Sequence, residues 1–387
     1  MRSLILLGST GSIGRQTLEL LAADRASFRV EGLAAARSWR ELLDQARTFR
    51  PRFVALQDAE SAALLRAELP AETALLAGPD AAVELARLGD YELAVHGIVG
   101  AAGVRVSAAV LERGRTLALA NKESLVVAGA PLMALARERG ATILPVDSEH
   151  SAVFQCLRGE NIGRVRRVIL TGSGGPFRTA GEHEIARATP EEALRHPNWS
   201  MGPRITVGSA TLMNKAFEII ELHHLFGLER ERIEVAIHPQ SIVHSLVEFV
   251  DGSVIAQMGP PDMKGPIHHA LHHPDRAPAT LRGFDFRAFR ELTFEEPDLA
   301  RFPALELGYE CVATGSDSGA VLNAADEVAV EAFLREEIGF GDLVRVARRT
   351  LARRPGFDRS VEDLLRSDAA ARELARAEIA ALRAAVA

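Results

Sequence analysis

Residues 8–14 read GSTGSIG, and this glycine-rich stretch decides how the first part of the chain folds. It follows the apolar run Ser3–Leu7, which predicts a buried strand, and precedes Gln16–Ala23, whose amphipathic pattern predicts a helix. Glycines at such a junction let the backbone turn tightly and approach a pyrophosphate, which the N–H groups of the helix N-terminus stabilise. The spacing is GxxGxxG rather than the commoner GxGxxG, so a plain tight turn is the alternative. The strand–turn–helix context favours a dinucleotide site.

Short strands and helices continue to alternate from this stretch to about residue 146. A helix is predicted at Trp39–Phe49. Further strands are predicted at Arg29–Ala34, Arg52–Leu56, Leu93–His96, Thr116–Ala120 and Thr142–Val146. Such alternation predicts a parallel sheet covered by helices on both faces. We therefore expect a Rossmann-like domain at residues 1–146.

The pattern changes after residue 146, where glycine and proline cluster between the predicted elements. Strands are predicted at Arg166–Leu170, Glu234–Ile237, Ser241–Val250 and Ser253–Met258, and the last two flank Asp251-Gly252, a hairpin signal. We expect an α+β domain at residues 147–273, a linker at 274–303 and a helical domain at 304–387. The predicted fold class is α/β, with an N-terminal parallel-sheet domain, a central α+β domain and a C-terminal α-helical domain.

Composition narrows the function classes. The 387 residues have a formal net charge of -7, which argues against nucleic acid as a partner. With only Cys156 and Cys311, neither a disulfide framework nor a CxxC metal motif can form, and a cytoplasmic location is expected. The apolar runs Leu4–Leu7 and Leu125–Ala136 are too short for a signal peptide or a membrane span, so no membrane partner is expected.

The end of the second predicted strand indicates which dinucleotide binds. Enzymes that use NAD usually carry an acidic residue there for the ribose 2′-hydroxyl. This chain instead has Arg37 and Ser38, which offer a guanidinium and a hydroxyl to a 2′-phosphate, while Glu31 lies earlier in the strand. We therefore expect NADP(H). A solvent-facing charge at a strand end is the alternative for Arg37.

Two acidic residues follow the strand that ends near residue 146. Asp147 and Glu149 are two positions apart, so they face the same side if the segment is extended. Two carboxylates held together favour a cation between them, and oxygen ligands suit Mg²⁺ or Mn²⁺. The alternative is a helix start, with Asp147 or Ser148 as the N-cap and the other acids in solvent.

A third carboxylate lies in the stretch SATLMNKAFE at Ser209–Glu218. On a helix, Asn214, Lys215 and Glu218 share one face. Lysine beside serine and asparagine is suited to a phosphate. The alternative is an amphipathic helix with an ordinary exposed Asn-Lys pair.

Three further stretches carry polar residues in loops. TGSGGPF at Thr171–Phe177 offers backbone N–H groups and the Ser173 hydroxyl to a phosphate. HPNWSMG at His196–Gly202 has the composition of a gating loop, although Trp199 could equally be a core anchor. ANKE at Ala120–Glu123 joins a strand to a helix and could place Lys122 at the substrate and Glu123 at the nicotinamide or ribose; an ordinary first helical turn is the alternative.

Together these stretches resemble the 1-deoxy-D-xylulose 5-phosphate reductoisomerase family of the methylerythritol phosphate pathway to isoprenoids. The matching stretches are Gly8–Gly14, Ala120–Ser124, Pro145–Ala152, Thr171–Arg178, His196–Gly202, Ser209–Lys215 and His238–Ser245. The resemblance spans essentially the whole chain. The chain departs from the family pattern at Ala36-Arg37-Ser38, where Gly-Lys-Asn is frequent, at Gly208, where Asp is common, and at Ala216-Phe217, where Gly-Leu is frequent.

The resemblance implies a role for each matching residue. The metal ligands would be Asp147, Glu149 and Glu218. The substrate would contact Lys122, Ser148, Glu149, Ser173, His196, Trp199, Ser209, Asn214, Lys215 and Glu218. NADPH would contact Thr10, Gly11, Ser12, Ile13, Ala36, Arg37, Ser38, Asn121, Glu123 and Gly202. The residues implied in catalysis are Lys122, Asp147, Glu149, His196 and Glu218.

The resemblance also implies an activity. A homodimer would bind a small phosphorylated sugar, NADPH and one divalent cation, Mg²⁺, Mn²⁺ or Co²⁺. Residues 1–146 would bind NADPH and residues 147–273 would form the catalytic, metal- and substrate-binding domain. The reaction would rearrange 1-deoxy-D-xylulose 5-phosphate and reduce it to 2-C-methyl-D-erythritol 4-phosphate. Two alternatives remain: another NADP-linked dehydrogenase of the sugar-phosphate or homoserine type, and a non-catalytic NADP-sensing protein.

Overall fold

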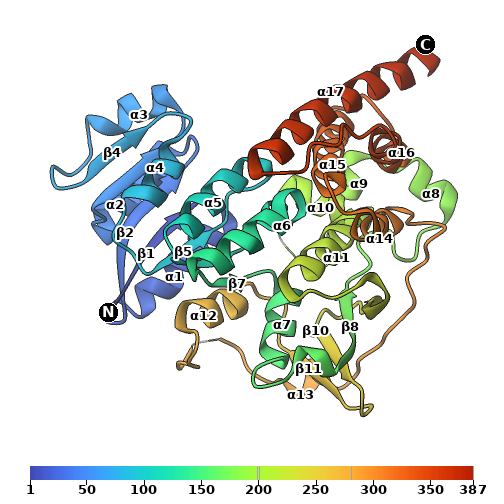
Figure 1. Ribbon diagram of the computed structural model, residues 1–387, viewed down its shortest axis with the longest axis horizontal. Coiled ribbons are helices and arrows are strands. Elements are labelled where there is room, and N and C mark those ends of the chain that lie inside the picture. Colours follow the sequence, from blue (N-terminus) through green and yellow to red (C-terminus); the bar gives the residue numbers. More distant parts are fainter. Residues whose placement is uncertain (198, 200, 280, 387) are drawn as a thin grey trace. The chain divides into compact units, whose positions relative to one another are not determined.

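The computed structural model describes residues 1–387 except 198, 200, 280 and 387, and the chain divides into two compact units (Figure 1). Unit 1 consists of Met1–Asn121, Leu132–Ser151 and Asp262–Leu281. Unit 2 consists of Lys122–Pro131, Ala152–Pro261 and Arg282–Ala387. Each unit therefore collects segments that are distant in the sequence.

Unit 1 is built on a seven-stranded sheet in which the strand order is β4-β3-β2-β1-β5-β6-β7. Its strands are β1 (Arg2–Leu7), β2 (Phe28–Ala35), β3 (Phe53–Leu56), β4 (Ala74–Ala77), β5 (Leu93–His96), β6 (Thr116–Leu119) and β7 (Ile143–Pro145). All of these pairings are parallel. The order reverses beside β1, and ligands of such sheets bind at the carboxyl ends of the strands there.

Buried residues on both faces explain why these strands are apolar throughout. Leu4, Ile5, Leu6 and Leu7 are fully buried, because helices cover both sides of a parallel sheet. The helices of this region are α1 (Ser12–Ala23), α2 (Trp39–Phe49), α3 (Ala59–Arg66), α4 (Ala81–Leu88), α5 (Val104–Glu112) and α12 (Lys264–His272), with the short η1 (Ala101–Gly103). Contacts join α12 to α1, which brings a late segment of the chain into unit 1. The predicted N-terminal parallel-sheet fold is confirmed.

Two helices cross from one unit to the other. α6 (Lys122–Arg139) loses helical geometry at Ala128, three residues before Pro131, and α7 is Ser148–Cys156. A proline inside a helix lacks the N–H for the hydrogen bond to the preceding turn and crowds the carbonyl four residues back. The break in α6 therefore has a local cause in the sequence.

Unit 2 contains a four-stranded sheet in the order β11-β10-β8-β9. Its strands are β8 (Val165–Gly172), β9 (Ile233–Ile237), β10 (Val243–Phe249) and β11 (Val254–Met258). β8 and β9 are parallel, whereas β10 is antiparallel to β8 and β11, so the hairpin predicted at Asp251-Gly252 is confirmed. Residues of β8, β10 and α11 (Met213–Phe226), among them Val168, Val247 and Ile219, share one buried core.

The remaining elements of unit 2 are helical. They are α8 (Glu182–Ala186), α9 (Pro190–Ala193), α10 (Pro203–Ala210), α13 (Phe286–Phe289), α14 (Ala304–Thr314), α15 (Ser318–Leu334), α16 (Phe340–Leu351) and α17 (Val361–Val386), with η2 (Ile162–Arg164) and η3 (Arg230–Arg232). From Ala304 onward the chain is helical as predicted, and α15 and α16 contribute to a second large buried core. Among the residues that the structure describes, no helix is both long and apolar enough to cross a membrane.

Candidate active site and cofactor-binding residues

The glycine-rich stretch after β1 forms the predicted strand–turn–helix junction. α1 begins at Ser12, with Gly11 as its N-cap, so Thr10 precedes the helix and Ile13 lies in its first turn. A Cβ on Gly14 would lie 2.3 Å from the carbonyl oxygen of Gly8, which explains why this position has no side chain. The first N–H groups of a helix have no partner within that helix, so this turn is suited to an anion.

The residues after β2 are exposed, and one of them, Arg37, is basic. Ala36, Arg37 and Ser38 link β2 to α2, and Ser38 is the N-cap of α2 without a side-chain cap hydrogen bond. The side chain of Arg37 is 86% exposed, and its Nε lies 3.8 Å from Oδ1 of Asp58. Glu31 is buried and pairs with Arg29, so it is engaged within the sheet and does not replace the missing acid at the strand end. This arrangement favours a 2′-phosphate over a bare ribose.

Asn121 connects the carboxyl ends of two neighbouring strands. Its side chain is buried, and Nδ2 donates to the carbonyl oxygens of Ile98 at 2.6 Å and Gly100 at 3.1 Å. The segment 97–101 follows β5, whereas Asn121 follows β6. Asn121 therefore lies at the edge of the sheet where a cofactor is expected to bind.

The carboxylate pair after β7 lies at a helix start, one of the two arrangements that the sequence left open. α7 begins at Ser148, so the segment is the helix start that was given as the alternative and not an extended segment, and Glu149 lies in the first helical turn. The turn nevertheless places carboxylate oxygens of Asp147 and Glu149 within 4.8 Å of one another. The Ser148 hydroxyl donates to Oε2 of Glu149, which orients that carboxylate. The two acids therefore lie close together, as predicted, because both are at the start of a helix.

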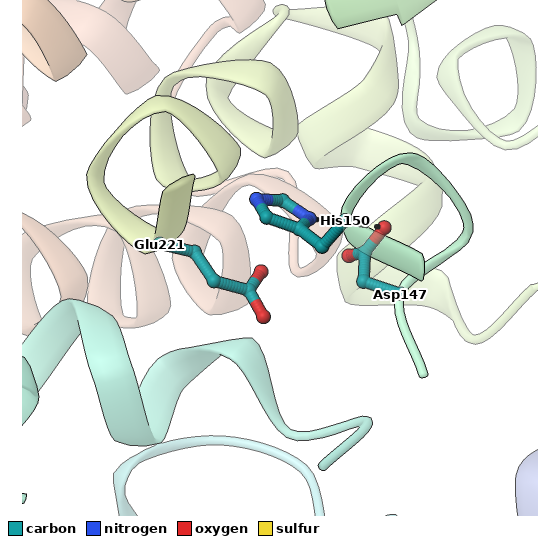
Figure 2. A group of neighbouring side chains, drawn as sticks. All are labelled: Asp147, His150 and Glu221. Carbon is teal, nitrogen blue, oxygen red and sulfur yellow. Dashed lines mark ion pairs between the residues drawn. The ribbon is translucent and has the colours of Figure 1, made fainter. Parts of the chain in front are cut away.

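His150, in the stretch Pro145–Ala152, lies beside Asp147. This histidine is fully buried, and its Nδ1 lies 3.7 Å from Oδ1 of Asp147, an ion pair drawn as a dashed line in Figure 2. Figure 2 also draws Glu221 of α11, a fully buried acid that the sequence reasoning missed. Its spacing of three residues from Glu218 was the available signal.

In unit 2, two lysines surround the carboxylate of Glu218. Oε1 of Glu218 accepts from Lys122 Nζ at 3.1 Å and from the Asn214 amide, and Oε2 accepts from Lys215 Nζ. Glu218, Lys122 and Lys215 are all buried. The prediction that Asn214, Lys215 and Glu218 lie on one face of α11 is confirmed. Lys122, at the start of α6, contacts the same face.

The glycine-rich loop after β8 lies against this group. Lys215 Nζ donates to the carbonyl oxygen of Thr171 at 2.5 Å, so its ammonium reaches the end of β8. Gly175 has a φ of +69°, and a Cβ there would lie 2.7 Å from the carbonyl oxygen of Ser209, at the end of α10. The structure therefore brings Lys215, Ser173 and Ser209 to one region of unit 2.

His196 links the predicted gating loop to the glycine-rich loop. Its Nδ1 accepts from the backbone N–H of Trp199 at 3.0 Å, and its Nε2 lies 3.0 Å from Oγ of Ser173. Burial lowers the pKa of His196, which favours the neutral ring. With Nδ1 as an acceptor, the proton of the neutral ring is on Nε2 and is donated to Ser173.

The structure describes only some of the other residues of the predicted gating loop. Asn198 and Ser200 lie outside them, Trp199 is half-buried, and Gly202 is the exposed N-cap of α10. Trp199 is therefore not a fully buried core anchor. The gating movement itself stays a prediction.

Family models and individual relatives that match this chain carry the name of the same enzyme. Residues 4–129 match the family described as 1-deoxy-D-xylulose 5-phosphate reductoisomerase, and residues 143–226 and 258–374 match its two C-terminal domain descriptions. The 1-deoxy-D-xylulose 5-phosphate reductoisomerase of Anaeromyxobacter dehalogenans is 50% identical over 351 residues, which cover 91% of this chain and 90% of that protein. The one of Chlorobium chlorochromatii is 47% identical over 378 residues, which cover 97% and 99%.

Solved structures of the same kind of enzyme are also similar. The enzyme from Zymomonas mobilis in complex with NADPH has a TM-score of 0.92 and 42% identity, and the match covers 98% of each chain. A DOX-P reductoisomerase in complex with NADPH, fosmidomycin and magnesium has a TM-score of 0.93 and 38% identity, and the match covers 99% of each chain. The similarity thus extends over nearly the whole length of each protein compared.

Proposed function

Since the chain belongs to the 1-deoxy-D-xylulose 5-phosphate reductoisomerase family, we propose that it rearranges and reduces 1-deoxy-D-xylulose 5-phosphate to 2-C-methyl-D-erythritol 4-phosphate with NADPH and a divalent cation. Within that proposal, residues 1–146 bind NADPH, residues 147–273 hold the metal and substrate, and residues 274–303 link them to a helical domain at 304–387. The product would enter the non-mevalonate pathway to isoprenoid precursors.

The observation that carries this proposal is the close carboxylate pair Asp147 and Glu149. Two like charges within 4.8 Å of one another repel unless a cation or a proton lies between them. Their oxygen atoms fit Mg²⁺ or Mn²⁺, and with Glu218 as the third ligand every protein donor is a carboxylate oxygen. When bound, such a cation acts as a Lewis acid and stabilises negative charge on the carbonyl and hydroxyl oxygens of the substrate during the rearrangement.

The residues around Glu218 are suited to the substrate phosphate and to the polar groups beside it. Lys122 and Lys215 place two ammonium groups against one carboxylate, so this cluster attracts an anion. Ser173, in the glycine-rich loop, and Ser209, at the end of α10, add hydroxyl groups. Holding the phosphate at this place orients the reacting carbons relative to the nicotinamide.

His196 and Trp199 control access in this proposal. His196 as a neutral ring donates to Ser173, and the same ring accepts from the backbone of Trp199. The position of the loop is therefore coupled to the serine that meets the substrate. Closure of the half-buried Trp199 over the substrate excludes water from the aldehyde before reduction.

NADPH supplies the hydride for the reduction. Thr10, Gly11, Ser12 and Ile13 surround the pyrophosphate in this proposal, and Arg37 and Ser38 contact the 2′-phosphate. The remaining cofactor contacts are assigned to Ala36, Asn121, Glu123 and Gly202. The exposed side chain of Arg37 supports this assignment, because it can reach a ligand without disturbing a buried contact.

We also propose a homodimer and a cytoplasmic location. β11 forms one edge of the sheet of unit 2, and Val254, Ile255 and Met258 on it are exposed. An exposed apolar edge strand is a template for pairing, and a second copy would cover it symmetrically. Both cysteines are free and buried, which fits a reducing compartment.

One incubation separates the proposal from its alternatives. The purified chain is mixed with NADPH, Mn²⁺ and 1-deoxy-D-xylulose 5-phosphate, the nicotinamide absorbance is followed, and the product is identified by NMR. We expect NADPH consumption and the branched product only when the metal is present. Reduction without rearrangement would indicate a different dehydrogenase, and NADPH binding without turnover would indicate a sensing protein.

A further inference from the structure

Arg204 connects three helices of unit 2 through a buried guanidinium. It lies in the first turn of α10, two residues after Gly202, and its side chain is 18% exposed. NH1 donates to Oε1 of Glu123 and to Oε1 of Glu327, each at 2.8 Å, and NH2 donates to Oδ1 of Asn323 at 2.8 Å. Glu123 belongs to the first turn of α6, whereas Asn323 and Glu327 belong to α15.

A second arginine extends this network without reaching α10. Arg372 of α17 donates to Oε2 of Glu327 and to Oδ2 of Asp368, both at 2.6 Å. Asn323 donates to Oδ1 of Asp368 at 3.3 Å, and this hydrogen bond connects the partners of Arg204 with those of Arg372. α15 therefore contacts Arg204 directly, whereas the α17 residues of this network contact residues of α15, and Arg204 in turn donates to Glu123.

The charges in this network favour the orientation in which Glu123 faces Arg204. Oδ2 of Asp326 lies 3.5 Å from NH2 of Arg204, so three acids, Glu123, Asp326 and Glu327, surround one guanidinium. Burial raises the pKa of Asp326 to about 6, and the guanidinium opposes that rise. Without the guanidinium, these carboxylates would face one another as like charges, and this repulsion disfavours the present orientation of Glu123.

We propose that Arg204 is a positioning residue for the cofactor, which fixes Glu123 for its contact with NADPH and sets the start of α10 beside Gly202. The inference rests on the proposed function, because Glu123 and Gly202 are cofactor contacts only within it. The planar guanidinium satisfies several acceptors at fixed angles, which the point charge of lysine cannot do. Through Arg204, α15 contributes to cofactor binding without contacting the cofactor.

The test uses the full chain with Arg204→Met, Arg204→Lys and the matched control Arg372→Met. Arg372 has a similarly low exposure, 24%, and shares Glu327, but it touches neither Glu123 nor α10. For each variant, NADPH affinity is measured by fluorescence titration, KM and kcat by turnover, and Tm by thermal unfolding. Loss of a charge-assisted hydrogen bond at a cofactor contact should weaken NADPH binding about tenfold.

We expect Arg204→Met to raise both the Kd and the KM for NADPH by about that factor, with a smaller change in kcat, and Arg204→Lys to lie between it and wild type. Arg372→Met should lower Tm and keep the NADPH affinity near that of wild type. In a Glu123→Gln background, Arg204→Met should add little, because both changes remove the same contact.

Unchanged NADPH affinity in Arg204→Met, with only a lower Tm, would show a purely structural role and overturn the inference. An equal loss of affinity in Arg372→Met would overturn it as well. If Arg204→Met does not fold, Arg204→Lys decides: weaker NADPH binding supports the inference and unchanged binding refutes it. Failure of wild type to convert the substrate would refute the proposed function instead, while the NADPH titration still tests Arg204.

Discussion

Replacing Glu218 with glutamine tests the centre of the proposed site. The substitution keeps the shape of the side chain and removes its charge. Glu218 is 1% exposed, and it accepts from Lys122 at 3.1 Å and from Lys215. The variant therefore leaves two buried ammonium groups beside a neutral amide.

The effects of this change on stability and on kcat can be estimated separately. Breaking a buried ion pair by removing one partner costs roughly 3–5 kcal/mol, so the free energy of unfolding should fall by about that amount. The loss of a metal ligand should lower kcat by roughly a factor of 100 or more, which corresponds to about 2.7 kcal/mol in the activation barrier. Urea unfolding measures the first effect, and NADPH consumption under saturating substrate measures the second.

Glu248→Gln is the matched control. Glu248 is also buried and pairs with two cations, Arg167 at 2.6 Å and Arg166 at 3.1 Å, but it has no role in the proposed reaction. These arginines are 39% and 66% exposed, so water can solvate them and the loss of stability should be smaller than for Glu218. Its kcat should equal that of wild type.

The two variants together distinguish folding from chemistry. If Glu218→Gln turned over substrate like wild type, Glu218 would not be a metal ligand. If it unfolded at the same urea concentration as wild type, the cost assigned to the two buried lysines would be wrong.

Four further predictions each concern a single residue. Arg37→Ala should raise the KM for NADPH more than that for NADH, and equal effects would remove the 2′-phosphate assignment. Gly14→Ala should lower Tm and NADPH affinity, because its Cβ would lie 2.3 Å from the Gly8 carbonyl oxygen. Gly208→Ala should instead be tolerated and add roughly 0.5–1 kcal/mol of stability, since a Cβ meets nothing closer than 3.5 Å in this helix; a lower Tm would contradict that. Burial lowers the pKa of His96 to about 4, so the unfolded chain takes up this proton first and stability should fall as the pH drops from about 6.5 to 4, by roughly 1.4 kcal/mol per unit. Urea unfolding of wild type and of a His96→Asn variant at several pH values measures this contribution, by which the slope of the variant should be smaller. His224 and His244, whose pKa values burial also lowers to about 4, keep the remaining slope in both proteins.

Local sequence patterns were enough to predict the strands of the sheet of unit 1, except β4. Strands buried on both faces are continuous apolar runs bounded by turns, and β1, β2 and β5 lie where such runs predicted them. β4 was missed, because Ala74–Ala77 is short and partly exposed. Edge strands of this kind lack the burial that makes a strand visible in the sequence.

The candidate site could be predicted only as far as local spacing reached. Asn214, Lys215 and Glu218 share a helix face, and helical periodicity is enough to predict that. The start of α7 at Ser148 was not predictable from the spacing of Asp147 and Glu149, because both an extended segment and a helix start bring two such acids together.

Contacts between distant segments were beyond sequence reasoning. Lys122 and Glu218 are 96 positions apart, and Arg204 meets partners 81, 119 and 123 positions away. Each side chain alone is typical of a helix surface. Only the tertiary packing of α6, α10, α11 and α15 makes them buried partners.

Crystals grown with Mn²⁺ and NADPH, with diffraction measured at the manganese absorption edge, test the metal site most directly. We expect one anomalous peak about 2.1 Å from carboxylate oxygens of Asp147, Glu149 and Glu218, the short distance typical of a small hard cation. A peak elsewhere, or carboxylates that surround no peak although the crystals turn over substrate, would contradict the account.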